Sequence, residues 1–468
     1  MIQKTSRLHT IVILGAGYSG TLTSVNILRK AVSEGIHILL IEGRLPFARG
    51  LAYHSWDDNL LLNVPAGNMS ALADEPGYFV SYCQNIDPAF NAHSFISRRI
   101  YGDYLEHTLA QAEKESLAVL HKVEGHAVAV HPFVDSTGFS VQMANGEIFS
   151  ADQLVLAFGH LLPKNPGLPS DFFATDSYIG NSWDFAALDG IDHDCPVLLI
   201  GSGHTAIDTL FRLTSSHPRK VFLVSRRGLR PHVHRSMAHQ TPLLVAFPSY
   251  LHEVPCTVRA YLHALRNEVA KRERCGGNWR DVINELRPHT SAIWSRFNLA
   301  ERRRFLIHTV AFWDIHRHRI SPSAHWRLTQ MLNSGQVEII PAYIQSYDPC
   351  DEGVNVRLRL RHEETTKVVR VDTVVNCTGP NYNISTSTMP LIKQLSNDGL
   401  LKQDSMKIGL ELDDQYQLID SHGTPVNRLY YVGPMLKARY WEAIAVPELR
   451  GHTLDLAKII LAEIEHEQ

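Results

Sequence analysis

The chain has 468 residues, which is enough for about three domains. Hydrophobic residues make up 44% of it and charged residues 20%, with 29 glycines and 23 prolines, a composition that excludes a mainly disordered or collagen-like chain. The formal net charge is −3, so the overall charge gives no general case for nucleic-acid binding.

The first predicted elements are a strand, a glycine loop, a helix and a second strand. Residues 11–14 (IVIL) are typical of a buried parallel strand, residues 15–20 (GAGYSG) match GxGxxG, and residues 36–41 form a second strand closed by Glu42. Glycines at this spacing permit a tight turn, close approach of a pyrophosphate and close helix packing, while the acid accepts hydrogen bonds from ribose hydroxyls. The alternative is a glycine-rich turn that serves packing alone. We predict an FAD site with contacts from Gly15, Gly17, Tyr18, Ser19, Gly20 and Glu42.

Prolines and glycines punctuate residues 44–105, which predicts that much of this stretch is loop. A long loop inside a compact domain is usually functional, so we expect it to wrap the FAD. Asn63 and Val64 are the candidate FAD contacts, with Asn63 as a donor to a polar edge of the flavin. Alternatively, Asn63 caps a turn.

A second glycine loop follows the predicted strand 195–200. Residues 201–206 (GSGHTA) match GxGxxA, and the next strand, 221–224, runs into Arg226 and Arg227. Arginines at the place that Glu42 holds in the first unit suit a ribose 2′-phosphate, although they are also compatible with a solvated surface pair. We predict an NADPH site with contacts from Gly201, Ser202, Gly203, His204, Thr205, Arg226, Arg227 and Gly379; His204 contacts phosphate or caps the helix.

Two further strand–glycine segments, residues 152–159 and 372–380, are typical of the crossings between the two domains of two-nucleotide flavoproteins. We predict that Gly159 contacts FAD. A last strand over residues 429–434 places Gly433 close to the flavin, and a terminal helix follows from about residue 445.

The fold class predicted is α/β, a two-dinucleotide-binding-domain flavoprotein in which the NADPH domain is inserted into a Rossmann-like FAD domain, plus a helical insert. The predicted boundaries are 1–190 and 340–468 for the FAD domain, 191–250 and 325–340 for the NADPH domain, and 251–325 for the insert. Residues 251–330 have helical periodicity and contain 14 basic and 7 acidic residues, a net charge of +7. This charge attracts NADPH phosphates or an anionic substrate, or it is a solvated face.

Cysteine and histidine spacing gives no metal site. The six cysteines show no CxxC pair, and the HxH pairs at 232/234 and 316/318 lack a carboxylate or cysteine at ligand spacing. No apolar run approaches the roughly 18 residues of a membrane span. We therefore expect a reduced, cytoplasmic protein with no metal, nucleic-acid or membrane partner, and the oligomeric state stays open.

Several longer segments resemble a known family. The chain is similar to the bacterial FAD/NAD(P)-binding proteins related to flavin-dependent N-hydroxylating monooxygenases and to an FAD-dependent urate hydroxylase. The resemblance implies an FAD-binding fold with an NAD(P)H domain. The segments that carry it are ILGAGYSG, GLAYHSWDDNLLLNVPAGNMSA, RRIYGDYL, LLIGSGHTAID, SRRGLRPHVH, ERRRFLIHTVAFWDIHRHR, VVNCTGP and WEAIAVPELRGHTLDLA.

We predict an NADPH-dependent flavin monooxygenase that transfers oxygen from a C4a-hydroperoxyflavin to nitrogen or activated carbon of a small substrate, with O2 as co-substrate. The candidate catalytic residues are Asn63, Trp441 and Glu442. Glu442 orients substrate or is a satisfied carboxylate at a helix start, and Trp441 is also compatible with a wall or core role. The alternatives are an NAD(P)H-dependent flavin reductase or oxidase without oxygen insertion, and a non-catalytic FAD/NADPH sensor.

Overall fold

The computed structural model describes residues 8–43, 46–54, 57–135, 137–166, 170–235, 246–351 and 353–467. The chain forms two compact units. Unit 1 comprises residues 1–56, 65–161 and 382–468, and unit 2 comprises residues 57–64 and 162–381. Residues 236–245 of the predicted NADPH domain lie outside the described residues.

Unit 1 is built on a six-stranded sheet. Its strands, with those of a small second sheet, are β1 (His9–Leu14), β2 (Ile36–Glu42), β3 (Val119–Glu124), β4 (Ala127–Pro132), β5 (Phe139–Met143), β6 (Ile148–Ala151), β7 (Gln153–Leu156), β15 (Gln417–Ile419) and β16 (Pro425–Tyr431). Its α-helices are α1 (Tyr18–Lys30), α2 (Gly50–Tyr53), α3 (Tyr78–Ile86), α4 (Arg98–Glu115), α13 (Pro390–Asn397) and α14 (Val446–Glu467). The strand order in the large sheet is β15-β16-β7-β1-β2-β3.

Four parallel strands of this sheet end in register. Leu14 of β1 pairs with Ile41 of β2 and with Leu156 of β7, and Leu156 pairs with Tyr431 of β16. Residues that follow these strand ends therefore meet at one edge of the sheet, where ligands bind in open α/β folds. Every residue of β7 is buried, which explains why Leu154, Val155 and Leu156 follow one another without polar alternation.

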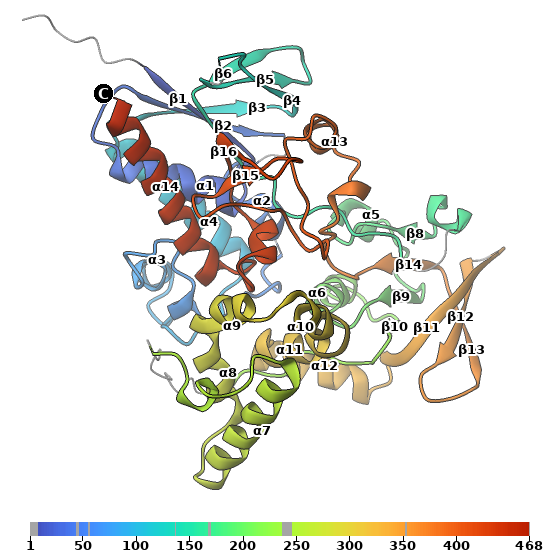
Figure 1. Cartoon of the computed structure of the whole chain (residues 1–468). Helices are drawn as coiled ribbons and strands as arrows, with labels where there is room; N and C mark the ends of the chain where they lie inside the picture. The colour runs from blue at the N-terminus through green and yellow to red at the C-terminus, as the bar shows by residue number, and fades with distance from the viewer. Residues whose placement is uncertain are drawn as a thin grey trace, which may run out of the picture. The chain divides into compact units, whose positions relative to one another are not determined.

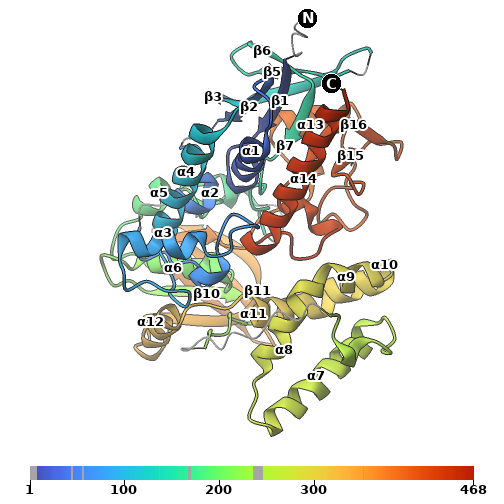
Figure 2. The same cartoon turned by 90° about the vertical axis from the view of Figure 1, so that its left-hand side faces the viewer.

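Helices and a small sheet complete unit 1 (Figure 1). Helix α14 lies along α1 in both views (Figure 2), and the Asn26 side chain donates from Nδ2 to Thr453 Oγ1 at 3.4 Å. The antiparallel sheet β4-β5-β6 contacts α13 through Gln394, whose side chain accepts from the Val130 N–H and donates to its carbonyl, each at 2.9 Å. These contacts join residues more than 250 positions apart, so α13 and α14 complete a unit begun by the N-terminus.

Unit 2 contains a seven-stranded sheet of order β13-β12-β11-β10-β9-β14-β8. Its strands are β8 (Tyr178–Ile179), β9 (Val197–Ile200), β10 (Val221–Ser225), β11 (Val337–Cys350), β12 (Gly353–Leu360), β13 (Thr366–Val371) and β14 (Thr373–Asn376). Its α-helices are α5 (Phe185–Asp189), α6 (His204–Leu213), α7 (Val258–Arg274), α8 (Trp279–Leu286), α9 (Thr290–Arg296), α10 (Leu299–Arg304), α11 (Val310–Arg317) and α12 (Pro322–Asn333).

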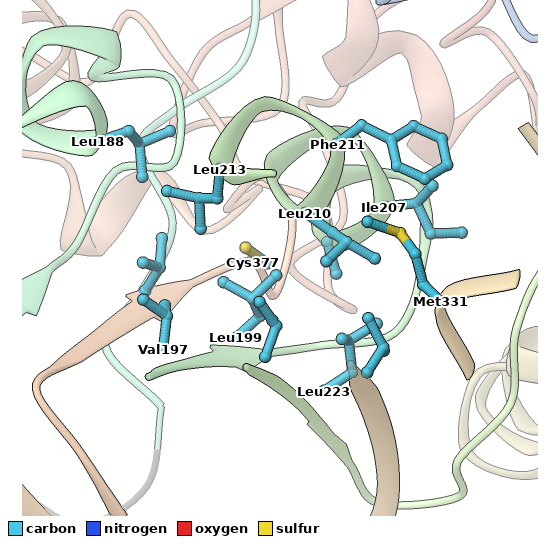
Figure 3. Packing of buried hydrophobic residues seen from close by; sticks show 14 of the residues in the cluster. Leu188, Val197, Leu199, Ile207, Leu210, Phe211, Leu213, Leu223, Met331 and Cys377 are labelled. Carbon is cyan, nitrogen blue, oxygen red and sulfur yellow. The ribbon is translucent and has the colours of Figure 1, made fainter. Parts of the chain in front are cut away.

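The core of unit 2 lies between α6 and the central strands of its sheet. Figure 3 shows Leu210 of α6 above Leu199 of β9 and Leu223 of β10, with Met331 of α12 on one side. Leu210 is fully buried, so α6 is held firmly where it begins after the second glycine loop. The packing thus fixes the position of that loop.

The division between the units differs from the boundaries predicted at residues 190 and 340. Apart from the short segment 57–64, the chain leaves unit 1 after Leu161 and returns at Tyr382, a few residues after the two strand–glycine segments. The reason lies in long-range pairing: β8 pairs with β14, and β11 pairs with β10 while continuing into the antiparallel strands β12 and β13. Residues 251–325 are largely helical, and they cluster with unit 2 rather than forming a third unit.

Helix α3 falls in the stretch 44–105, of which much was predicted as loop. Its Phe79 is fully buried against Tyr101 and Tyr104 of α4, with ring centroids 4.9 and 4.8 Å apart. This tertiary packing of aromatic rings stabilises a short helix that glycine and proline punctuation did not indicate. In the part of the chain that the structure describes, no helix is long and apolar enough to cross a membrane.

Candidate dinucleotide sites

The glycines of the first loop have separate structural roles. Gly15 has φ +110°, and a Cβ there would lie 2.5 Å from the carbonyl oxygen of Ala157. A Cβ on Gly20 would lie 1.8 Å from the carbonyl oxygen of Gly15, so the close packing of α1 on its own loop requires glycine. Gly17 begins α1 as its N-cap with φ −72°, and a Cβ there would only reach ordinary contact with Gly50. Gly17 is therefore the position at which the loop leaves room for a ligand at the helix N-terminus.

The predicted acid lies beside this loop. Glu42 Oε2 accepts a hydrogen bond from the backbone N–H of Ala16 at 2.8 Å, which holds the carboxylate at the sheet edge. On the other side of β1, Gly433 has φ +144°, and its missing Cβ would lie 3.7 Å from Ser19 Oγ. Gly159 follows β7 with φ +70° and has nothing within 4 Å of a Cβ. The structure thus brings the predicted FAD residues of unit 1 to one edge of one sheet.

The segment that contains Arg49 and Gly50 passes close to Gly17. Sequence reasoning missed the residue that anchors this segment. Gly50 has φ +53°, and a Cβ there would lie 2.8 Å from Gly17 Cα. The preceding Arg49 is buried and donates from Nε to Glu106 Oε1 of α4 at 2.6 Å, with a further ion pair to Asp103. These carboxylates raise the pKa of Arg49 through hydrogen bonds and charge, against the opposing effect of burial. The ion pairs position this segment, part of the stretch that we predict to wrap FAD.

Trp441 and Glu442 are both buried in unit 1, with exposed fractions of 3% and 2%. The Lys437 ammonium lies over the Trp441 ring at 4.5 Å from its centroid and over the Tyr382 ring at 5.1 Å, as a cation–π pair with each. Glu442 has φ +73°, a conformation that costs a non-glycine residue of order 1 kcal/mol or more and is concentrated at functional sites. Glu442 lies in a turn that precedes Val446, where α14 begins, so the alternative of a carboxylate at a helix start is wrong. The strained backbone of Glu442 supports a role beyond packing.

The second loop repeats the design of the first. Gly201 has φ +135°, and a Cβ there would lie 2.5 Å from the Cys377 carbonyl oxygen, close to the end of β14. Gly203 is the N-cap of α6 with φ −87°, and a Cβ there would meet nothing within 4 Å. Ile200 of β9 pairs with Asn376 of β14, so Gly379, with φ +88°, follows the neighbouring strand end. The free space at Gly203 is the feature that a phosphate-binding loop requires.

A hydroxyl chain shapes the turn that carries the predicted 2′-phosphate arginines. Ser202 Oγ donates to the carbonyl of Leu229, because a carbonyl only accepts, so Ser225 Oγ donates to Ser202 Oγ at 2.8 Å. Ser225 Oγ in turn accepts from the Gly228 N–H at 3.0 Å. Ser202 therefore acts on the arginine turn through its side chain.

The two arginines of that turn differ in their surroundings. Arg226 is exposed, whereas Arg227 is half-buried and donates from Nη2 to the Ile307 carbonyl at 3.3 Å. Arg361 donates from Nη1 to the Arg226 carbonyl at 2.9 Å, which adds a third cation that sequence reasoning missed. Arg361 is 135 residues away along the chain, and no local motif marks it.

His204 and Asn63 both have interactions that the sequence did not indicate. His204 Nε2 donates to the His318 carbonyl at 2.9 Å, so the ring joins the second loop to the helical region rather than capping α6. His234 Nε2 donates to the Asn63 carbonyl at 3.0 Å. Burial, with a contribution from Arg319, lowers the pKa of His234 to about 3, so its ring is a neutral donor at pH 7. Asn63 and Val64 belong to unit 2, apart from the other FAD residues proposed, which all lie in unit 1.

Among the described residues, no group of three or more His, Cys, Asp or Glu side chains is placed to hold a metal ion. The residues at the two sheet edges fit dinucleotides instead. Each loop has one glycine at a helix N-terminus where a Cβ would meet no close contact: ordinary contact with Gly50 at Gly17, and open space at Gly203. A carboxylate flanks the loop of unit 1, and arginines flank the loop of unit 2. The fold and these loops define a flavoprotein with two dinucleotide-binding units.

Comparison with known proteins agrees with this class. Residues 12–161 match the family described as FAD-NAD(P)-binding, which confirms the predicted cofactor class and the resemblance to that family. No curated protein matches the chain. Several solved structures share the fold of this protein over nearly the whole length of the chain.

Three of the most similar solved structures come from two bacterial genera. Reduced ornithine hydroxylase (PvdA) from Pseudomonas aeruginosa is 15% identical with a TM-score of 0.64, and covers 98% of this chain and 100% of its own. Kutzneria sp. 744 ornithine N-hydroxylase (KtzI) with reduced FAD, NADP+ and L-ornithine is 14% identical with a TM-score of 0.63, covering 98% and 99%. L-lysine 6-monooxygenase from Pseudomonas syringae is 16% identical with a TM-score of 0.63, covering 97% and 99%. The predicted fold class is thereby confirmed.

Replacing Arg226 and Arg227 together by alanine is expected to raise the KM for NADPH by about 10- to 100-fold, since one or two charge-assisted hydrogen bonds to the 2′-phosphate are lost. The KM for NADH, which lacks that phosphate, should stay within about twofold. Steady-state oxidation of each nucleotide measures both values. Arg259→Ala, at an exposed arginine of α7, is the control. Equal changes for NADPH and NADH would contradict the 2′-phosphate assignment.

Proposed function

We propose that this protein is an FAD-dependent, NADPH-using monooxygenase that hydroxylates a small substrate at nitrogen or activated carbon. The observation that carries the proposal is the contrast between the two similar glycine loops, residues 15–20 and 201–206. A carboxylate flanks the first loop, and arginines flank the second. This contrast supports FAD in unit 1 and NADPH in unit 2. The fold shared with ornithine and lysine hydroxylases supports the choice of reaction class.

The proposed roles of the residues follow from their positions. Gly17 and Gly203 admit the pyrophosphates at the N-termini of α1 and α6, and Glu42 binds the FAD ribose. Bound FAD supplies the redox chemistry, taking a hydride from NADPH and activating O2. In unit 1, the buried Trp441 and Glu442 exclude water and orient the substrate. In unit 2, the Asn63 carbonyl accepts from His234, and the role of Asn63 as a donor to the flavin stays a prediction.

The test is an absorbance series on the purified protein with NADPH added anaerobically, followed by oxygen. The proposal expects a bound flavin that NADPH bleaches, a long-lived absorbing species after oxygen returns, and NADPH consumption coupled to a hydroxylated product in a screen of amino acids and purines. Immediate reoxidation of the flavin by oxygen, with release of hydrogen peroxide and no hydroxylated product in the screen, supports the reductase or oxidase. Bound flavin that NADPH does not reduce supports the non-catalytic sensor.

A further inference from the structure

A buried arginine in the helical region of unit 2 has a charge that its hydrogen bonds do not neutralise. Arg319 is only 6% exposed. It donates from Nη2 to Asn284 Oδ1 of α8, and its buried Nε has no hydrogen-bond partner in the described part of the chain. An amide oxygen accepts a hydrogen bond but brings no negative charge. A buried guanidinium in this state is costly unless an anion joins it.

The neighbours of Arg319 increase this cost. Burial and the nearby arginines at 235, 280, 287 and 317 lower the pKa of Arg319 to about 9. Arg280 and Arg319 share one aromatic ring, with guanidinium carbons 4.4 and 5.9 Å from the centroid of Trp279. Arg280 donates from Nε and Nη2 to the Val233 carbonyl at 2.9 and 2.7 Å, another uncharged partner. The acid at this place, Asp281, pairs with Arg235 at 2.6 Å.

Backbone and ring contacts place Arg319 beside both proposed functional segments of unit 2. The carbonyl of the residue before it, His318, accepts from His204, the first residue of α6 after the turn of the second loop. The residue after it, Ile320, accepts at its carbonyl from the His234 N–H at 3.0 Å, and the His234 ring donates to the Asn63 carbonyl. A ligand group bound at Arg319 would thus lie, within unit 2, next to the second glycine loop and to the segment that contains Asn63.

We propose that Arg319 and Arg280 form an oxyanion-binding site that takes a carboxylate or phosphate group of a bound ligand. A guanidinium binds either group through paired, charge-assisted hydrogen bonds, and an anion here supplies the charge that Asn284 and Val233 lack. A carboxylate would belong to a small anionic ligand other than the nucleotide. A phosphate would belong to the nicotinamide nucleotide at the adjacent loop. The site itself requires neither assignment.

The test measures the melting temperature of the full chain with malonate or inorganic phosphate, against chloride at equal ionic strength. The wild-type protein is expected to melt at a higher temperature with one of the two oxyanions than with chloride, because a ligand that binds only the folded state stabilises it. Arg319→Gln is expected to melt at or above the wild-type temperature without ligand, since a buried charge is removed. Its half-saturating oxyanion concentration should rise about tenfold or more, and Arg280→Gln should shift it in the same direction.

The matched control is Arg219→Gln. Arg219 is also 6% exposed, but it lies before the start of β10, whereas the turn with Arg226 and Arg227 follows the end of that strand. Asp192 and Asp194 are near Arg219. This variant should keep the oxyanion response of the wild-type protein. A wild-type protein that responds to neither oxyanion more than to chloride overturns the proposal. An Arg319→Gln variant that melts several degrees lower and keeps the response overturns it too, because the role of Arg319 is then structural.

Two titrations distinguish the sources of the anion. If NADP+ binds Arg319→Gln about tenfold more weakly than wild type, the site takes a phosphate of the nucleotide. If the NADP+ Kd stays within about twofold while the malonate response is lost, it takes a carboxylate. These readouts require no flavin reduction and no oxygen, so failure of the monooxygenase proposal leaves them interpretable.

Discussion

Gly20→Ala is expected to remove bound FAD and to lower the free energy of unfolding of the protein by about 3 kcal/mol. A Cβ at this position would lie 1.8 Å from the carbonyl oxygen of Gly15 and 3.2 Å from the Ala157 side chain. The first of these is backbone and belongs to the glycine loop itself, so relief of the clash must move either the loop or α1. The loop that holds the pyrophosphate would therefore be displaced together with the helix.

The ratio of flavin to protein absorbance and a denaturant titration measure the two effects. Gly451→Ala is the matched control, because Gly451 lies within α14 and a Cβ there meets nothing within 4 Å. Alanine should stabilise that helix by about 1 kcal/mol and leave the FAD content unchanged. A Gly20→Ala protein with wild-type stability and full flavin would contradict the packing role of this glycine.

Gly203→Ala is expected to weaken NADPH binding by about 10- to 100-fold while the protein keeps its fold, since the methyl group would occupy the place where a phosphate accepts from the loop N–H groups. Gly203 has an ordinary negative φ and open space around a Cβ, so the stability should change by no more than about 1 kcal/mol. The FAD content should stay at the wild-type level. The Kd for NADP+ and the melting temperature together test this separation of binding from folding.

Gly201→Ala provides the contrast within the same loop. Its φ of +135° and the Cys377 carbonyl oxygen at 2.5 Å from a Cβ predict that alanine there destabilises unit 2 itself. Loss of NADP+ binding would then accompany a lower melting temperature. If Gly203→Ala bound NADP+ as tightly as the wild-type protein, the second loop would not be the nucleotide site.

Much of the two glycine loops and their flanking elements could be predicted from the sequence because their physical requirements are local. A buried parallel strand, a glycine turn and a helix N-terminus follow one another within about ten residues in each unit, and glycine spacing reflects contacts inside the same loop. One such contact joins Gly20 to Gly15, because a Cβ on Gly20 would lie 1.8 Å from the Gly15 carbonyl oxygen. The residue at the end of the second strand also follows from the same repeat: Glu42 is the last residue of β2, and Arg226 comes directly after β10.

Residues that are distant in the chain and contact the segments around these loops could not be predicted in this way. Arg49 anchors the segment over Gly17 through carboxylates 54 and 57 residues away, and Arg361 reaches the Arg226 carbonyl across 135 residues. The same holds for Arg319, whose charge was visible in the basic composition of residues 251–330 while its burial was not. Burial depends on how α8, α11 and α12 pack, and composition does not report it.

The sequence by itself determined that two strand–loop–helix units exist, and that a carboxylate faces one and arginines the other. The tertiary structure alone decided where one unit ends and the next begins, because β8 and β11 pair with strands that are close in space and distant in the chain. It also decided which basic residues are solvated and which are buried against uncharged partners. Hydrophobic periodicity and glycine spacing are properties of neighbouring residues, whereas strand pairing and desolvation arise only when the whole chain is packed.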